Sequence, residues 1–318
     1  MRLEKNLLFD IYEKMLRIRS FELKAQDLFA NHKIPGFMHL YAGVEGVAAA
    51  ACANLTAKDY ITSTHRGHGH LLAKGADVKR LMAELMGKWD GYSRGKGGSM
   101  HIADLEIGLL GTNGIVGAGQ PIAAGAAFAL KYLKSEAVVV SFLGDGASNR
   151  GTFHEALNFA ASFKLPVIFV CENNQNNCNY QSLASIKSEI SDRAKNYGIP
   201  GITVDGSDVT LVYEAVNKAV LRARLGEGAS LVDCKVWRHN VNFEGAYCSY
   251  QKASEQAAWQ AKDPIVRLEK KILDYHYGAQ SDLTALRAKV EAEIDAAVIF
   301  ADNSPYPSPS ELVTNVWA

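Results

Sequence analysis

Short runs of branched apolar residues alternate along the chain with longer segments in which apolar residues recur at helical spacing. The short runs predict strands over residues 60–63, 138–143, 166–171, 202–204 and 231–237. The helical spacing predicts helices over residues 7–30, 44–54, 77–86, 121–134, 149–163, 191–197, 209–225, 263–277 and 281–302. Strands without polar alternation, separated by helices, predict a doubly wound α/β fold on a mostly parallel sheet.

This alternation runs through most of the chain without an internal repeat, so residues 1–303 are expected to form a single domain. Ser191 is placed to cap the start of the helix over residues 191–197. The Pro-rich segment 304–318 is expected to be an extended arm that becomes ordered only against a partner. The first predicted helix has one apolar face, made of Leu8, Ile11, Met15, Ile18 and Phe21, which could pack on its own domain or on a partner.

The composition is that of an ordinary globular protein, with 48% hydrophobic and 21% charged residues in a chain of 318. Lys plus Arg and Asp plus Glu both number 34, which argues against a general nucleic-acid surface or a basic membrane patch. No apolar stretch is long and pure enough to span a bilayer. Five Cys and no cationic-apolar leader favour a reducing, cytoplasmic location.

Two polar clusters follow successive predicted strands. Gly144-Asp145-Gly146 comes after the strand 138–143, and Glu172-Asn173-Asn174 comes after the strand 166–171. Asp145 and Asn174 are 174 − 145 = 29 residues apart, about the length of one strand–helix–strand repeat. Because ligands collect beyond the carboxyl ends of parallel strands, these two side chains are expected to meet at one site.

The chemistry of the two clusters points to a metal and a phosphate. A carboxylate and an amide oxygen suit Mg²⁺ or Ca²⁺, which often bind alongside phosphates. The glycines let backbone approach a ligand closely, and the helix after Asp145 offers its N-terminus to an anion. The alternative is that the first cluster is an ordinary turn and the second an ordinary loop. The spacing favours a metal-bridged diphosphate.

A histidine-rich segment follows the first predicted strand. His65, Arg66, His68 and His70 are expected to lie in a glycine-flexed loop. A metal site is disfavoured because Arg66 would repel a cation. An anion pocket is favoured, since Arg and His donate hydrogen bonds to phosphate oxygens, while a solvated polar loop remains an alternative.

Two glycine-rich segments add weaker signals. Residues 94–101 lack the spacing of a phosphate-binding loop and predict a tight turn or a contact with a partner. Gly114 and Gly117 flank two branched residues, an arrangement that suits backbone contact with a flat ligand.

The spacing of GDG and NN resembles the signature of thiamine-diphosphate enzymes. Nearly the whole chain is similar to the α subunit of the two-chain, E1-type thiamine-diphosphate dehydrogenases, most of all to the acetoin dehydrogenase branch and less to the pyruvate and branched-chain enzymes. The resemblance is carried by several segments, among them GFMHLYAGVEGVAAA, TSTHRGHGHLLAKGAD, GKGGSMHIAD, NGIVGAGQPIAAGAA, GDGASNRGTFHEALNFA, LPVIFVCENN and KDPIVRLEKKIL.

The resemblance implies a site for Mg²⁺ and thiamine diphosphate. The metal would be held by the side chains of Asp145 and Asn174 and by a backbone oxygen near Asn176. The diphosphate would contact a set of side chains and backbone groups that comprises His65, Arg66, Gly144, Gly146 and Ala147. Gly114 and Val116 would line the aminopyrimidine ring through their backbone.

The resemblance also implies an incomplete active site. His39 would face the reacting carbon, with His65 and Asn242 as further catalytic candidates. The glutamate that activates the aminopyrimidine belongs to a separate β subunit, which implies an α2β2 heterotetramer with the cofactor at an α/β interface. The enzyme would cleave a C–C bond next to the carbonyl of acetoin or a 2-oxo acid and pass the unit to the lipoyl group of an acyltransferase.

The chain departs from the family pattern near the expected cofactor mouth. Asn242, Ala246 and Gln251 stand where the family has His, Asp and Arg, and Asn cannot shuttle protons as His can. His239 is a possible substitute after a loop shift. Arg150 replaces a usual Gln, and the loop 175–180 lacks a usual aromatic.

These departures leave two other functions open. The chain could belong to a carboligase that transfers the activated unit to a non-lipoyl acceptor, or it could be a non-catalytic scaffold for a β subunit. A nicotinamide-binding protein is disfavoured because no strand–helix turn carries the GxGxxG fingerprint.

Overall fold

The computed structural model describes residues 3–174, 176–177, 180–181, 188–239, 243–245, 261–314 and 316. These residues contain a five-stranded sheet in the order β1-β2-β3-β7-β6, in which all neighbouring strands are parallel. A separate antiparallel pair joins β4 and β5. The strands are β1 (Tyr60–Thr62), β2 (Val139–Gly144), β3 (Val167–Asn173), β4 (Asn176–Asn177), β5 (Tyr180–Gln181), β6 (Gly201–Asp205) and β7 (Ser230–Lys235).

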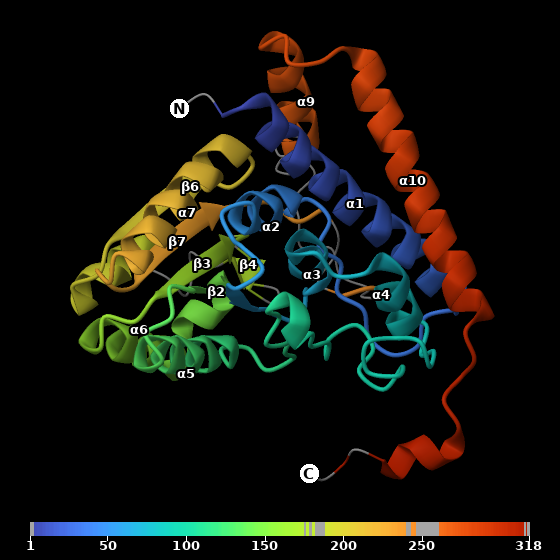
Figure 1. Ribbon diagram of the computed structural model, residues 1–318, viewed down its shortest axis with the longest axis horizontal. Helices are drawn as coiled ribbons and strands as arrows, with labels where there is room; N and C mark the ends of the chain where they lie inside the picture. The colour runs from blue at the N-terminus through green and yellow to red at the C-terminus, as the bar shows by residue number, and fades with distance from the viewer. Residues whose placement is uncertain are drawn as a thin grey trace.

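Helices connect and cover the strands (Figure 1). The α-helices are α1 (Lys5–Ala30), α2 (Glu45–Cys52), α3 (His68–Lys74), α4 (Val78–Leu85), α5 (Gly119–Tyr132), α6 (Gly151–Ser162), α7 (Val209–Arg224), α9 (Pro264–Asp274) and α10 (Gln280–Asn303). The 3-10 helices are η1 (Leu105–Ile107), η2 (Asp145–Asn149), η4 (Ile190–Tyr197) and η5 (Pro309–Val313). The predicted α/β fold with a mostly parallel sheet is confirmed.

Successive side chains of a strand point to opposite sides, and the central strands β2, β3 and β7 are buried on both faces. Val140 and Phe142 of β2 pack into the core cluster that contains α1, α2 and α7. Val139 and Leu143 pack into the second cluster, with α5 and α6. Figure 1 shows α5 and α6 together on one side of the sheet. This double coverage explains why the strands read as continuous apolar runs.

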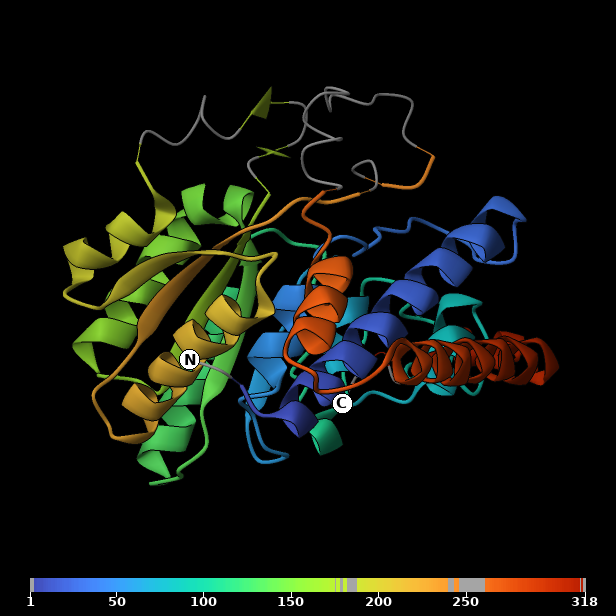
Figure 2. The same cartoon turned by 90° about the horizontal axis from the view of Figure 1, so that it is seen from above.

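The helices α1, α9 and α10 form a group beside the sheet. α1 contacts both α9 and α10, and Figures 1 and 2 show α1 and α10 side by side. The predicted apolar face of α1 is buried within its own chain. Arg19 of α1 forms ion pairs with Glu45 and Asp263, and Asp263 caps α9. None of the helices in the described part of the chain has the length and apolar character of a bilayer span.

Three local expectations are wrong. His68 and His70 lie in α3, not in a loop, and both are fully buried. The segment after β2 forms the 3-10 helix η2, and α6 begins only at Gly151 because the intervening Arg150 is extended. Ser191 does not cap η4; its hydroxyl pairs with Thr203 at 2.7 Å. In each case a contact from another part of the chain overrides the local signal.

The C-terminal segment contacts its own chain. After α10 ends at Asn303, Pro305 accepts a hydrogen bond from the backbone N–H of Trp89 at 2.8 Å. The ammonium of Lys88 lies 3.9 Å from the centre of the Tyr306 ring. Glu311 pairs with both Arg94 and Lys96 at 3.3 Å. The described part of this segment therefore lies against residues 88–96 of its own chain.

One buried carboxylate organises the glycine-rich segment that follows α4. Glu84 Oε2 accepts hydrogen bonds from the backbone N–H groups of Ser93 and Gly95, at 2.7 and 3.0 Å. Glu84 Oε1 accepts from Gly97 and Gly98, at 2.8 and 3.0 Å. The segment wraps around this side chain, which explains a turn with few apolar residues of its own.

We expect Glu84→Ala to destabilise the protein by at least about 3 kcal/mol, because it leaves four backbone donors without their charged acceptor. Urea unfolding of the purified protein measures this change. The exposed Glu106 provides the matched control. Glu106→Ala should change the free energy of unfolding by less than about 0.5 kcal/mol. Equal effects of the two substitutions would contradict this account.

Candidate functional site

A cleft opens beyond the carboxyl ends of β2 and β3. Its open space, counted out to the solvent at its mouth, is about 890 Å³. The residues that line it include most of the predicted site, namely His65, Arg66, Val116, Gly144, Asp145, Gly146, Ala147 and Asn174. Segments that are far apart in the sequence therefore meet at the edge of the sheet where ligands of such folds collect.

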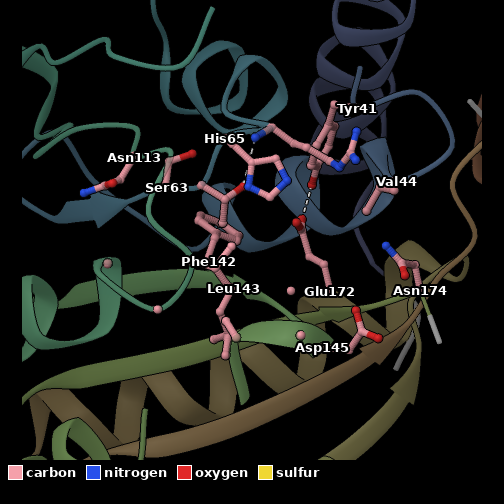
Figure 3. Close-up of a pocket in the computed structure, with 18 of the residues that line it drawn as sticks. Tyr41, Val44, Ser63, His65, Asn113, Phe142, Leu143, Asp145, Glu172 and Asn174 are labelled. Carbon is pink, nitrogen blue, oxygen red and sulfur yellow. Dashed lines mark hydrogen bonds between the residues drawn. The ribbon is translucent and has the colours of Figure 1, made fainter. Parts of the chain in front are cut away.

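Parallel pairing of β2 with β3 brings the two polar clusters together. Gly144 is the register partner of Glu172, so Asp145 and Asn174 both lie just past the same strand ends. Figure 3 shows the Asp145 carboxylate beside the Asn174 side chain. One carboxylate and one amide oxygen, with open space around the position of a Cβ on Gly144, fit a hard divalent cation with a phosphate beside it.

The alternative metal site at the histidine-rich segment is not supported. His68 and His70 are buried in α3, while His65 lines the cleft. In the described part of the chain, no three His, Cys, Asp or Glu side chains converge in a way that could hold an ion. Asp145 and Asn174 are thus the better candidates for metal ligands.

Hydrogen bonds from Ser148 and Arg193 hold the turn that carries Asp145. The Ser148 hydroxyl donates to the backbone carbonyl of Asp145 at 2.7 Å. Arg193 donates to the carbonyl of Ser148 and, at 2.8 Å, to the side chain of Asn149. Residues 146–147 lie in the first turn of η2 and line the cleft, at the end of a helix where backbone N–H groups commonly bind anions.

Arg66 and His65 also line the cleft, and His39 packs against His65. Arg66 is 8% exposed, and its guanidinium donates to the Leu40 carbonyl at 3.0 Å. The rings of His65 and His39 meet edge to face, with their centres 4.8 Å apart. His39 Nδ1 is buried and has no hydrogen-bond partner among the described residues. His39 therefore joins the site through His65, although it does not line the cleft itself.

Burial keeps both histidines neutral. Desolvation, followed by the nearby charge of Arg66, lowers the pKa of His65 to about 3. The same two causes lower the pKa of His39 to about 4, whereas an ordinary imidazole has a pKa of about 6.5. At neutral pH each neutral ring can donate one hydrogen bond and accept another. Among these three residues, the positive charge comes from Arg66.

The sequence analysis missed several polar residues of the cleft. Tyr41 donates a hydrogen bond to the Glu172 carboxylate, as Figure 3 shows, and both side chains line the cleft. Burial and the charge of Glu172 raise the pKa of the Tyr41 hydroxyl well above its usual value. The available signal was an ionisable residue at the end of an apolar strand, two positions before Asn174. Arg238 and Gln120 also line the cleft.

Other predicted residues are placed less directly. Gly114 lies beside the ring of His101, next to the cleft-lining residues Asn113 and Ile115. Only the backbone of Asn176 is described, in β4. Asn242, like Ala246 and Gln251, falls outside the described residues.

His239 does not take the place of the missing loop histidine. Its backbone N–H donates to the Ala42 carbonyl at 3.0 Å, and its Nε2 lies 3.7 Å from the Asp263 carboxylate. It is not among the residues that line the cleft. The structure therefore does not support the idea that His239 substitutes for it at the site.

The depressed pKa values of His39 and His65 predict acid sensitivity. The unfolded chain binds these protons more tightly than the folded chain, so their contribution to stability is fully present above about pH 6.5 and is lost as the pH falls towards 4 and then 3. We expect His65→Asn to reduce the drop in melting temperature between pH 7 and pH 4.5. The exposed His32 is the control: His32→Asn should leave the pH profile parallel to the unmodified protein. A parallel profile for His65→Asn would contradict the assignment.

Comparison with known proteins agrees with this geometry. The family model for the dehydrogenase E1 component matches residues 13–310. The α subunit of acetoin:2,6-dichlorophenolindophenol oxidoreductase from Bacillus subtilis is 48% identical over 96% of this chain and 92% of its own length. The protein of the same name from Cupriavidus necator is 44% identical over 99% and 95%. The pyruvate dehydrogenase E1 α subunit of Porphyra purpurea is 40% identical over 99% and 94%. This chain therefore belongs to the dehydrogenase E1 component family.

Proposed function

We propose that this chain is the α subunit of a thiamine-diphosphate-dependent dehydrogenase that, with a β subunit, cleaves the C–C bond next to the carbonyl of acetoin. The observation that carries the proposal is the meeting of Asp145 and Asn174 in a cleft that Arg66 also lines. Acetoin is preferred to a 2-oxo acid because two of the most similar relatives are named for it.

Each part of the cleft has a role in this proposal. Asp145 and Asn174 hold Mg²⁺ through their side-chain oxygens, with a backbone oxygen near Asn176. Arg66 and the backbone N–H groups at residues 146–147 bind the diphosphate, and His65 adds a neutral hydrogen bond. The bound cofactor supplies a carbanion equivalent and an electron sink for breaking a bond next to a carbonyl.

The remaining residues orient the reacting end. The backbone of Gly114 and Val116 lines the aminopyrimidine ring. The resemblance implies that His39 faces the reacting carbon; its buried Nδ1 has no hydrogen-bond partner among the described residues, and the ring meets the cleft through His65. A neutral imidazole can both donate and accept a hydrogen bond at neutral pH. Asn242 is proposed as a further polar contact in the same region.

The proposal requires a second chain. In the resemblance that supports it, the activating glutamate belongs to a β subunit, so the cleft is half of a site completed in an α2β2 heterotetramer. The catalytic domain is proposed to comprise residues 1–303, with residues 304–318 as an arm. The buried thiols of Cys52, Cys171 and Cys234 are reduced, which supports a cytoplasmic location.

A carboligase is the second candidate. The replacement of the usual loop residues by Asn242, Ala246 and Gln251 changes the part of the family site that shapes the path of a lipoyl arm. The same cofactor chemistry could then deliver the activated unit to a different acceptor.

Substrate oxidation by the complete enzyme tests the proposal. The chain is co-expressed with its β subunit, and reduction of 2,6-dichlorophenolindophenol is followed with thiamine diphosphate, Mg²⁺ and either acetoin or pyruvate. We expect a kcat/KM for acetoin at least about tenfold above that for pyruvate, which is about 1.4 kcal/mol of discrimination. Acylation of a lipoyl domain would exclude the carboligase. C–C bond formation without dye reduction would replace the dehydrogenase with it.

Removal of the metal ligand tests the site itself. We expect Asp145→Ala to weaken thiamine diphosphate binding more than about 100-fold, because Asp145 is the only carboxylate proposed to hold the cation that would bind with the cofactor. Titration calorimetry of the α/β complex with Mg²⁺ measures this affinity. The control is Asp192→Ala, at an exposed carboxylate paired with Lys195. If the unmodified complex binds no cofactor at all, the chain is a scaffold.

A further inference from the structure

Two buried histidines in the first turn of α3 each link a glutamate to a serine. His68 Nδ1 lies 3.0 Å from Glu22 Oε1 of α1, and His68 Nε2 lies 2.9 Å from Ser99 Oγ in the glycine-rich segment. Glu22 and His68 are fully buried, and Ser99 is 6% exposed. This chain of contacts lies outside the residues that line the cleft.

The second chain has the same composition and lies on the cleft side. His70 Nε2 lies 2.9 Å from Glu172 Oε1, and His70 Nδ1 lies 2.8 Å from Ser63 Oγ. The His70 ring also stacks on Phe142, with the ring centres 3.9 Å apart. Glu172 and Ser63 both line the cleft, where Glu172 also accepts from Tyr41.

The polarity of each chain follows from its acid. A carboxylate only accepts, so in a neutral imidazole the nitrogen that faces it carries the proton, and the other nitrogen accepts the serine hydroxyl proton. His68 faces its glutamate with Nδ1, whereas His70 uses Nε2. The two rings therefore face their acids through opposite nitrogens, and each has both nitrogens engaged.

Ser99 has the partners of a hydrolytic serine but lacks the surroundings of one. The neighbouring backbone N–H groups of Gly97 and Gly98, which could stabilise an oxyanion, are already bound to Glu84. The hydroxyl is also almost entirely buried. The arrangement is suited to holding backbone in place, not to nucleophilic attack.

The backbone that is held is the segment that carries Arg66. In the sequence Gly67-His68-Gly69-His70, a Cβ on Gly67 would lie 2.2 Å from the Thr112 side chain, and one on Gly69 would lie 2.1 Å from the Tyr41 ring. The glycines allow close packing where the histidines make their contacts. The segment is thus fixed on both sides, by α1 and the glycine-rich segment and by the ends of β1 and β3.

We propose that His68 and His70 are positioning residues that, through Ser99, Glu22, Ser63 and Glu172, hold the Arg66 guanidinium in the geometry that binds the diphosphate. The inference rests on the proposed function. Part of the cofactor affinity would then depend on these hydrogen-bonded side chains, which fix the position of Arg66, and not only on the residues that contact the cofactor. Preorganisation of this kind reduces the ordering cost of binding.

Ser99→Ala is the variant of choice because Ser99 is remote from the cleft lining. The α/β complex is titrated with thiamine diphosphate at saturating Mg²⁺, and hydrogen exchange of the peptide over residues 63–71 is followed without cofactor. We expect the Kd for thiamine diphosphate to rise about tenfold, because a residue that binds the cofactor loses the contact that orients it. Hydrogen exchange of this peptide should become faster. At saturating cofactor, kcat should stay within about twofold.

The matched control is Ser304→Ala, at a buried serine whose hydroxyl donates to Asp90 at 2.7 Å far from the cleft. Its Kd should stay within about twofold of the unmodified complex. Ser63→Ala interrupts the second chain and provides the test if Ser99→Ala does not assemble; its Kd should also rise about tenfold.

Three outcomes would decide the matter. An unchanged Kd in Ser99→Ala, with a lower melting temperature, would reduce the chains to a folding role and overturn the inference. An equal loss in Ser304→Ala would do the same. A complex that binds no thiamine diphosphate even when unmodified would overturn the proposed function and, with it, this inference.

Discussion

The site depends on the register between two neighbouring parallel strands. Because Gly144 lies opposite Glu172, the residues that follow both strands emerge at the same edge of the sheet. A shift of one residue would turn Asp145 or Asn174 toward the other face, since side chains alternate along a strand. The buried apolar residues of β2 and β3 prevent such a shift, because it would also expose them to the wrong core cluster. The packing of the core thus also fixes the relative position of Asp145 and Asn174.

Charge in the cleft is distributed unevenly. Carboxylates lie at the strand ends, and the buried Arg66 and Arg238 lie among the other lining residues. Desolvation lowers the pKa of His65, which lines the cleft, and of His39, which packs against it. A polarised cleft of this kind suits a ligand that brings both a cation and an anion.

The sequence predicted the five strands of the sheet and most helices because each of them carries its own pattern of apolar residues. It also placed Asp145 and Asn174 together, since both follow strands of one repeat. It failed for His68 and His70, whose helix is stabilised by glutamates distant in sequence. Glu172 was placed in the polar cluster after its strand but was given no role, for a related reason. Its hydrogen-bond partner Tyr41 lies 131 residues away in the sequence. Local patterns do not encode partners of this kind.

The C-terminal arm is attached by contacts of a different physical nature from those of the core. Glu311 reaches Arg94 and Lys96 across half-exposed ion pairs, which ions in solution screen and which contribute little to stability. Around them, Leu312 and Val313 remain exposed to water. The outer part of the arm, around Glu311, is therefore held by contacts that dissolved salt weakens, whereas its beginning keeps the backbone hydrogen bond from Trp89 to Pro305.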